Sequence, residues 1–195
     1  MGHREDLLAG AVRCLREKGY AKTTARDIVA ASGTNLASIG YHYGSTKALL
    51  NAAVLQAMDD FGAQMARAMG EVDASATTLE RFERFWASVI DSFRTSDQVW
   101  LATFDIFAVA QRDPEVRAAV AAGLEDARTF WAQIIYGVDA DDQQARAIGS
   151  LHQGLVSGIL VQWLIDPERA PSAADLAGAL AAIAGQITAA QVRPR

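Results

Sequence analysis

Apolar positions recur at intervals of three and four residues along most of the chain, and this spacing predicts helices rather than strands. Between Arg4 and Lys18 the apolar stripe consists of leucine, alanine and valine, and Gly19 follows as a residue suited to end a helix. No segment alternates apolar and polar residues as a half-buried strand does. The pattern therefore predicts an all-α protein of about nine helices.

The two helices that follow are expected to be short. Thr23 and Thr24 are residue types that cap a helix, and the segment from Ser32 to Asn35 supplies a turn glycine and a second capping residue. The next helix is then expected from Leu36 to Tyr43, with Leu36 and Ile39 facing inward. Two short helices joined by a turn with glycine form a helix-turn-helix, whose second helix can enter the major groove of DNA.

Six longer helices are expected after this motif, and Pro114 suits the first position of one of them, with Asp113 as its cap. The first is long enough to run out of an N-terminal head into a C-terminal body, so that a tilt at its far end would move the recognition helix. We place a DNA-binding domain at residues 1–50 and a ligand-binding and dimerisation domain at residues 51–195. The expected ranges are about 45–69, 78–93, 97–111, 114–136, 141–165 and 172–191.

Charge is divided unevenly between these two parts. The whole chain carries −5, but residues 1–50 hold seven Lys and Arg against four acids, a net charge of +3. The remaining residues hold 11 against 19, a net charge of −8. A basic head on an acidic body is typical of a DNA-binding protein, although +3 predicts few phosphate contacts per chain.

The candidate DNA-contacting residues are small, hydroxyl-bearing, aromatic or basic. Small residues let a helix approach base edges, and hydroxyl, imidazole and ammonium groups can bind bases or phosphates. Tyr43 is a candidate for the core instead. The candidates are Thr23, Thr24, Asn35, Ala37, Ser38, Gly40, Tyr41, His42 and Lys47.

The segment from Arg4 to Leu50 resembles the DNA-binding domain of the TetR family of bacterial one-component regulators. The resemblance lies in the Thr pair, Ile-Val-Ala at 28–30, the turn glycine, the aromatic at 43 and Gly-Ser-x-Lys at 44–47. The family usually has an aromatic where this chain has Gly40 and often a lysine where it has Thr46. The resemblance implies phosphate contacts for Tyr41 and Lys47, each one position later than usual.

Large aromatic side chains concentrate between residues 82 and 131. For any single one, burial in the core is the more common role. In the resemblance this region surrounds an effector pocket, where polar groups such as Thr103, Asp105, Gln133 and His152 would orient an apolar or aromatic ligand. The predicted ligand-binding residues are Phe82, Trp86, Ile90, Trp100, Thr103, Phe104, Phe107, Phe130, Trp131 and His152.

The last two helices are expected to form a dimer. A stripe of small residues in the first of them permits close approach of another helix, and two interior glycines, each costing roughly 1 kcal/mol, suggest a packing reason. The segment also resembles the family's dimerisation helix, which implies a four-helix bundle from two chains. The alternative is that the last helix covers its own core. The predicted interface is Ser150, Gly154, Ser157, Gly158, Val161, Leu180, Ile183 and Ile187.

Enzymatic and membrane functions find little support in the sequence. The three histidines have no metal-ligand spacing, and neither a phosphate loop nor a nucleophile motif occurs. The acidic run at 139–142 lacks further ligands, so we expect no metal and no cofactor. The single Cys14 fits a reducing compartment, and neither a signal peptide nor an unbroken apolar run of membrane length is seen, so we expect a cytoplasmic, nucleoid-associated protein without membrane contact.

The working hypothesis is therefore a homodimeric, ligand-responsive transcriptional regulator and not an enzyme. It would act as a repressor on a palindromic double-stranded DNA operator and leave it when a small apolar or aromatic effector binds. One alternative is a helical small-molecule binding protein without operator-binding activity. The other is a cofactor-free enzyme that uses Asp105 or His152 as a base.

Overall fold

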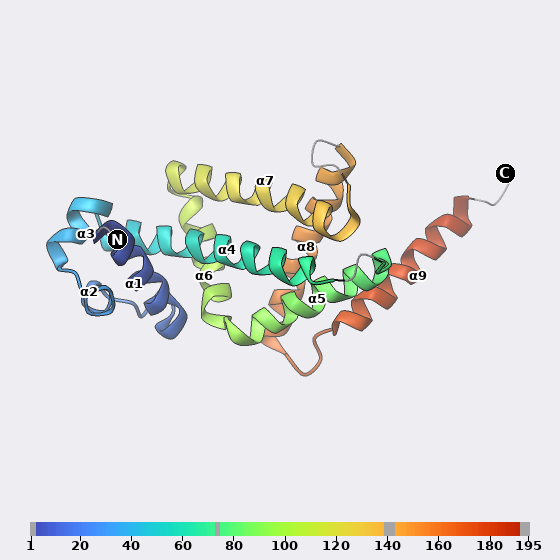
Figure 1. Ribbon diagram of the computed structural model, residues 1–195, viewed down its shortest axis with the longest axis horizontal. Coiled ribbons are helices and arrows are strands. Elements are labelled where there is room, and N and C mark those ends of the chain that lie inside the picture. Colours follow the sequence, from blue (N-terminus) through green and yellow to red (C-terminus); the bar gives the residue numbers. More distant parts are fainter. Residues whose placement is uncertain (1–2, 73–74, 139–142, 192–195) are drawn as a thin grey trace. The chain divides into compact units, whose positions relative to one another are not determined.

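The computed structural model describes residues 3–72, 75–138 and 143–191. These residues form helices joined by short connections and contain no strand, so the predicted all-α fold is confirmed (Figure 1). The helices are α1 (His3–Lys18), α2 (Ala25–Ser32), α3 (Leu36–Tyr43), α4 (Thr46–Gly70), α5 (Thr78–Thr95), α6 (Asp97–Ala110), α7 (Pro114–Tyr136), α8 (Gln143–Ile165) and α9 (Ala173–Gln191).

The chain divides into two compact units that do not follow the sequence order. The first unit contains Met1–Gln64 and Thr95–Ala127, and the second contains Met65–Arg94 and Arg128–Arg195. Helices α4 and α7 each contribute to both units. The boundary at residue 50 was placed from the sequence to separate a DNA-binding part from a ligand-binding part. It remains a prediction about which residues carry each function, whereas the two units describe how the chain packs.

The first unit is held together by two apolar clusters. One cluster joins α1, α2, α3 and the start of α4, with Leu7, Ile28 and Leu49 fully buried. The other begins at Leu15 of α1 and continues through Val54 of α4 to Ile106 of α6. Helix α1 therefore packs on the helix-turn-helix with one part of its apolar stripe and on α6 with another.

The second unit has a core of α5, α8 and the end of α7. Phe85 and Trp86 of α5, Ile135 of α7 and His152 of α8 are all almost fully buried. Arg81 of α5 donates to the carbonyl oxygens of Ile134 and Ile135, which satisfies acceptors at the end of α7.

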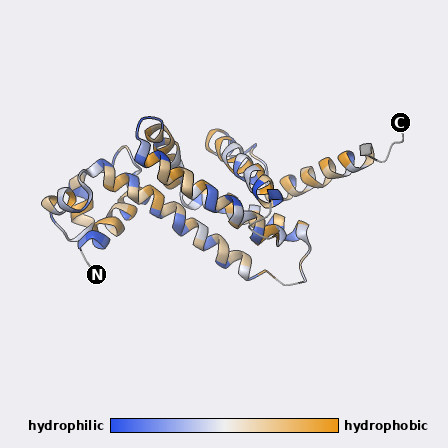
Figure 2. Ribbon diagram, turned by 90° about the horizontal axis from the view of Figure 1, so that it is seen from above, coloured by the Kyte–Doolittle hydropathy of each residue, from blue (hydrophilic) through white to orange (hydrophobic). Residues whose placement is uncertain are grey.

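The last helix, α9, packs little of its surface inside its own unit. Ala177 is its only buried hydrophobic residue among those whose burial is described, whereas Ile183 and Ile187 are each 56% exposed. Apolar residues occur along the length of α9 (Figure 2). A helix with this much exposed apolar surface calls for a partner.

Helix α8 is long and apolar enough to cross a bilayer if length and composition alone are considered, with a mean hydropathy of 1.3 over its most apolar stretch. The same composition occurs in core helices of water-soluble proteins. Here α8 carries the buried His152, and its Gln153 accepts a hydrogen bond from Arg128 of α7. These polar contacts favour packing against helices of the same chain over lipid contact.

Candidate functional site

The start of α2 is fixed by a reciprocal cap. The hydroxyl of Thr24 accepts from the backbone N–H of Asp27 at 3.3 Å, and the Asp27 carboxylate accepts from the backbone N–H of Thr24 at 2.9 Å. Asp27 also forms an ion pair with Lys18 of α1. The bonds from Lys18 and Thr24 hold the pKa of the Asp27 carboxyl well below its usual range. The cap predicted from the sequence is present, and it is tied to α1.

Thr23 lies in the interior of the head. Its side chain is buried, and its hydroxyl donates to the carbonyl oxygen of Gly19 at 2.7 Å. Gly19 has a φ of 78°, a conformation that favours glycine, so the hydroxyl and the glycine together shape the connection from α1 to α2. The structure thus shows a supporting role for Thr23, and its contact with DNA stays a prediction.

Helix α3 presents small and aromatic residues to solvent. Asn35 caps it by accepting from the backbone N–H of Ser38 at 3.0 Å. Tyr41 is 85% exposed, and its ring meets the ring of His42 edge-on at 4.8 Å. Ala37 and Gly40 are also exposed, so nothing in the described chain covers this face. The arrangement leaves a helix face free to approach DNA.

Leu36 was expected to face inward, and this expectation is wrong: its side chain is 54% exposed. Asn35 occupies the cap, so Leu36 is the first residue of α3 and lies in its exposed first turn. Ile39, at 3% exposure, anchors α3 to the core instead. Tyr43, which was a candidate for the core, is half-buried, and its hydroxyl donates to the carbonyl oxygen of Arg4 at 2.9 Å.

Lys47 lies in the first turn of α4 and is exposed. Ser45 caps this helix by accepting from the backbone N–H of Ala48 at 3.0 Å. The ammonium group of Lys47 has no ion-pair partner among the described residues. It is available to an anion from outside the chain.

Aromatic rings enclose His152 in the second unit. The ring centroids of Phe82, Phe85, Trp86 and Tyr136 lie between 5.5 and 6.3 Å from that of His152. We call these five residues, together with Trp131, the aromatic cluster. Trp131 joins it through Phe85, at 5.9 Å between ring centroids. Phe82, Trp86, Trp131 and His152 were predicted ligand residues, and the structure brings them together.

Two nitrogen atoms of the aromatic cluster have no hydrogen-bond partner in the described structure. His152 Nε2 lies 2.8 Å from the hydroxyl of Tyr136, but its Nδ1 and the Nε1 of Trp86 are buried without one. Burial lowers the pKa of His152 to about 4, so the imidazole is neutral at neutral pH. A buried polar atom left unpaired costs roughly 1–3 kcal/mol, which a bound ligand or water would recover.

The remaining predicted ligand residues are divided between the units. Ile90 is buried and Phe130 half-buried in the second unit, whereas Trp100, Thr103, Phe104 and Phe107 belong to the first. Thr103 donates to the carbonyl oxygen of Trp100 at 2.6 Å, and the ring of Trp100 meets that of Phe61 at 5.0 Å. Phe104 is 38% exposed. Helical spacing identified the aromatic residues, but it could not group them by unit.

Sequence reasoning left two members of the aromatic cluster, Phe85 and Tyr136, out of the predicted ligand set. Phe85 falls within the aromatic-rich segment between residues 82 and 131, and Tyr136 was expected only as the end of the helix at about 114–136. The signal that could have found Tyr136 is its hydroxyl at the end of an apolar run, since a buried phenol needs a hydrogen-bond partner.

The predicted dimer residues lie on exposed surfaces of α8 and α9. Ser150, Gly154, Ser157 and Gly158 are exposed, and Val161 is 46% exposed. Open space surrounds the Cα atoms of both glycines, so no other part of the described chain approaches them. Leu180 is partly buried, while Ile183 and Ile187 are exposed. Most of these residues are exposed on their own helices, and the dimer itself remains a proposal.

Metal binding finds no support among the described residues, because no three His, Cys, Asp or Glu side chains gather there. The acidic run at 139–142 lies outside the residues that the structure describes.

Comparison with known proteins assigns the family. Residues 7–53 match the family model of bacterial regulatory proteins of the tetR family, and residues 77–186 match that of the tetracyclin repressor-like C-terminal domain. The chain belongs to the TetR family. It is therefore a member of a family of DNA-binding transcriptional regulators, as the helix-turn-helix and the resemblance predicted.

Solved structures share the whole architecture of this TetR-family chain. A transcriptional regulator from Streptomyces coelicolor A3(2) is 23% identical, with a TM-score of 0.68 over 93% of this chain and 97% of that one. The multidrug binding protein EbrR, in complex with proflavin, is 19% identical, with a TM-score of 0.62 over 87% and 92%. A regulator from Saccharomonospora viridis, in complex with choline, is 20% identical, with a TM-score of 0.60 over 91% and 92%. No curated protein matches the chain.

Proposed function

We propose that this TetR-family regulator is a homodimeric repressor that binds a palindromic operator and leaves it when a small apolar or aromatic effector occupies the aromatic cluster. One observation carries the proposal: a braced, outward-facing recognition helix shares the chain with a buried aromatic cluster whose polar atoms lack partners. The first feature suits DNA, and the second suits a ligand.

The head supports DNA binding through its rigidity as well as its surface. The cap of α2, the ion pair between Lys18 and Asp27, and the bond from Tyr43 to Arg4 fix the two short helices on α1. Tyr41 and Lys47 then extend from fixed positions, Tyr41 for base edges or phosphates and Lys47 for a phosphate. Two such heads in a dimer would address half-sites about one helical turn, roughly 34–36 Å, apart.

The aromatic cluster supports an effector with a flat or apolar body. Aromatic rings offer area for stacking, and their faces also attract cations. His152 Nδ1 and Trp86 Nε1 would give the ligand its orientation. EbrR in complex with proflavin and the S. viridis regulator in complex with choline are ligand complexes of structural neighbours that agree with this chemistry.

The two events are coupled only if the effector favours a dimer that fits the operator less well. By linkage, DNA then weakens effector binding by the same factor. Helix α4 begins at the head and ends in the second unit, so it is the covalent connection from the head along which we expect such a change to pass, although α7 also joins the two units.

DNA binding is tested with an operator selected from a randomised duplex pool. Fluorescence anisotropy would give the dissociation constant at two salt concentrations for the parent, Tyr41→Ala and Lys47→Ala. Each substitution should weaken binding by at least about tenfold, because each removes a contact worth roughly 1–3 kcal/mol, and Lys47→Ala should reduce the salt dependence as well. Arg84→Ala, which removes an exposed arginine from α5, is the matched control.

Unchanged affinity in both head variants would contradict the assignment of the DNA contacts. Failure of the parent to select any duplex would favour the alternative of a small-molecule binding protein. An enzymatic function is not proposed, since the family consists of regulatory proteins.

A further inference from the structure

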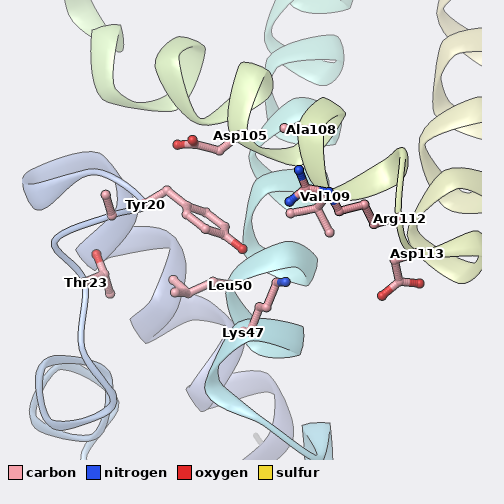
Figure 3. A pocket seen from close by; sticks show the side chains of 10 residues that line it. Tyr20, Thr23, Lys47, Leu50, Asp105, Ala108, Val109, Arg112 and Asp113 are labelled. Atoms are coloured by element: carbon pink, nitrogen blue, oxygen red, sulfur yellow. The ribbon is translucent and has the colours of Figure 1, made fainter.

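An open cavity of about 620 Å³ lies inside the first unit and shares no residue with the aromatic cluster (Figure 3). Its walls come from the connection between α1 and α2, the first turns of α4, and the end of α6 with the turn that follows. The volume falls within the range of roughly 300–1,000 Å³ that is typical of small-molecule sites. None of its residues is among the ten predicted ligand-binding residues, although Asp105 was one of the polar groups considered for orienting an effector.

Two cationic groups point into this cavity. The ammonium of Lys47 and the guanidinium of Arg112 both face its middle, from α4 and from the turn after α6 (Figure 3). Neither side chain has an ion-pair or hydrogen-bond partner among the described residues. Two uncompensated cations that converge on one space repel each other, and an anion between them would remove that repulsion.

The acids of the cavity do not compensate these cations. Asp113 accepts from the backbone N–H groups of Glu115 and Val116, so its charge serves the N-terminus of α7. Asp105 lies on α6, the same wall as Val109, and its carboxylate points away from Lys47 and Arg112 (Figure 3). Neither acid therefore forms an ion pair with Lys47 or Arg112 in the part of the chain that the structure describes.

The remaining wall is apolar and held in place. Leu50 and Val109 contribute aliphatic surface, and the ring of Tyr20 lies between the cations and Thr23 (Figure 3). The hydroxyl of Tyr20 donates to Asn51 Oδ1 at 2.7 Å, which fixes the ring. An apolar wall beside two cations suits a ligand with a hydrophobic body and one anionic end.

We propose that this cavity binds a small amphiphilic carboxylate, with its carboxylate between Lys47 and Arg112 and its hydrocarbon or aryl part against Tyr20, Leu50 and Val109. The planar guanidinium matches a carboxylate in a bidentate geometry, and Lys47 adds a point charge. The occupant is a small molecule because a DNA phosphate would carry nothing to cover the apolar wall.

Such a ligand acts on DNA binding independently of the effector. It holds the ammonium of Lys47 in the cavity, where it cannot reach a DNA phosphate, and it ties α4 to the α1–α2 connection and to the end of α6. The effect on DNA binding rests on the proposed contact between Lys47 and a DNA phosphate. Binding of the carboxylate to the cavity does not depend on that contact.

The test uses isothermal titration of the full-length, DNA-free protein with 4-phenylbutyrate, and with 4-phenylbutanamide and 4-phenylbutylamine as uncharged and cationic counterparts. The carboxylate should bind at least about tenfold more tightly than either counterpart, and Arg112→Gln should remove most of that difference. Arg84→Gln, which neutralises an exposed arginine of α5, should leave the binding unchanged.

Ala108→Phe supplies a second variant that keeps both cations. Ala108 lines the cavity and is exposed, so a larger side chain there fills the space without entering the core, and it should abolish binding. Equal binding of carboxylate and amide would overturn the proposal. So would carboxylate binding that survives Arg112→Gln and Ala108→Phe but disappears in His152→Gln, since the ligand would then occupy the aromatic cluster.

The consequence for DNA is measured separately. With the selected operator, saturating 4-phenylbutyrate should weaken the parent's affinity severalfold and have no effect on Ala108→Phe. An unchanged operator affinity would overturn the coupling while the carboxylate site stands. A parent that binds no operator would overturn the proposed function, whereas the titration without DNA would still decide the site.

Discussion

The imidazole of His152 is 2% exposed, and its Nδ1 has no hydrogen-bond partner in the described structure. Most buried polar groups in proteins are paired, so an unpaired one indicates either a tolerated cost or a missing ligand. The bond between Nε2 and the hydroxyl of Tyr136 fixes the ring. His152 Nδ1 is therefore a fixed nitrogen of a neutral ring, surrounded by aromatic side chains, with which an effector can form a hydrogen bond.

Burial of this imidazole makes the stability of the protein depend on pH. Its pKa is about 4 in the folded chain, against about 6.5 for an unhindered histidine. Between these values the unfolded chain binds a proton that the folded chain does not, so the free energy of unfolding falls as the pH is lowered. Each pH unit in this window costs about 1.4 kcal/mol.

His152→Gln should remove this dependence. Between pH 7 and pH 4.5 the parent should lose about 2–3 kcal/mol more of its free energy of unfolding than the variant does, because glutamine takes up no proton. Urea unfolding at both pH values measures the difference. Equal losses in parent and variant would show that the imidazole is accessible to water and can be protonated in the folded state.

Helix ends were predictable from the sequence because the signals are local. Thr24, Asn35, Ser45 and Asp113 each cap a helix through a bond to a backbone N–H two or three residues ahead. The start predicted for α8, near residue 141, lies outside the described residues. Capping depends on residue type and order alone, so no knowledge of the tertiary fold was needed.

The sequence predicted less well which side chains come together at each site, because that depends on which helices pack against each other. Helical spacing marked both Trp86 and Trp100 as apolar-face residues, yet Trp86 packs around His152 and Trp100 packs on Phe61 in the other unit. The cavity beside Lys47 is lined by three segments that are distant in the sequence, so no local sequence pattern predicts it. The spacing of apolar residues indicates which face of a helix is buried, but it does not indicate which other helix packs against that face.

Two helix-interior glycines should respond in opposite ways to alanine. A Cβ at Gly149 of α8 would overlap the carbonyl oxygen of Arg128, a backbone atom that cannot rotate away, whereas a Cβ at Gly123 of α7 would meet open space. Gly149→Ala should destabilise the protein by about 2 kcal/mol through overpacking. Gly123→Ala should stabilise it by about 0.5–1 kcal/mol through helix propensity.

Urea unfolding of both variants tests this contrast, since the chemical change is the same and only the surroundings differ. A stabilised Gly149→Ala would mean that α7 and α8 do not approach each other as closely as the structure shows. Far-ultraviolet circular dichroism would confirm that each variant keeps its helices.

At the scale of the whole molecule, α8 and α9 expose several large apolar side chains. Val161, Ile183 and Ile187 are about half exposed, and Gly154 and Gly158 of α8 have open space around them. Exposed apolar surface next to small residues favours a second copy of the same chain, since a two-fold contact uses one patch twice. Each head carries a net charge of only +3, and a dimer doubles the number of phosphate contacts because it brings two heads to the DNA.

Ile183→Asp should therefore convert the protein into a monomer, because burying two unpaired carboxylates near the two-fold axis costs far more than the contact gains. Sedimentation velocity would show about half the parent's mass, and anisotropy would show operator affinity reduced by at least about a hundredfold, since each half-site would then be bound without the effective concentration that the second head provides. Leu101→Asp, which places the same charge at a 43% exposed leucine of α6, should sediment like the parent. If Ile183→Asp sediments with the mass of the parent, α9 only covers its own chain, and the palindromic operator loses its structural basis.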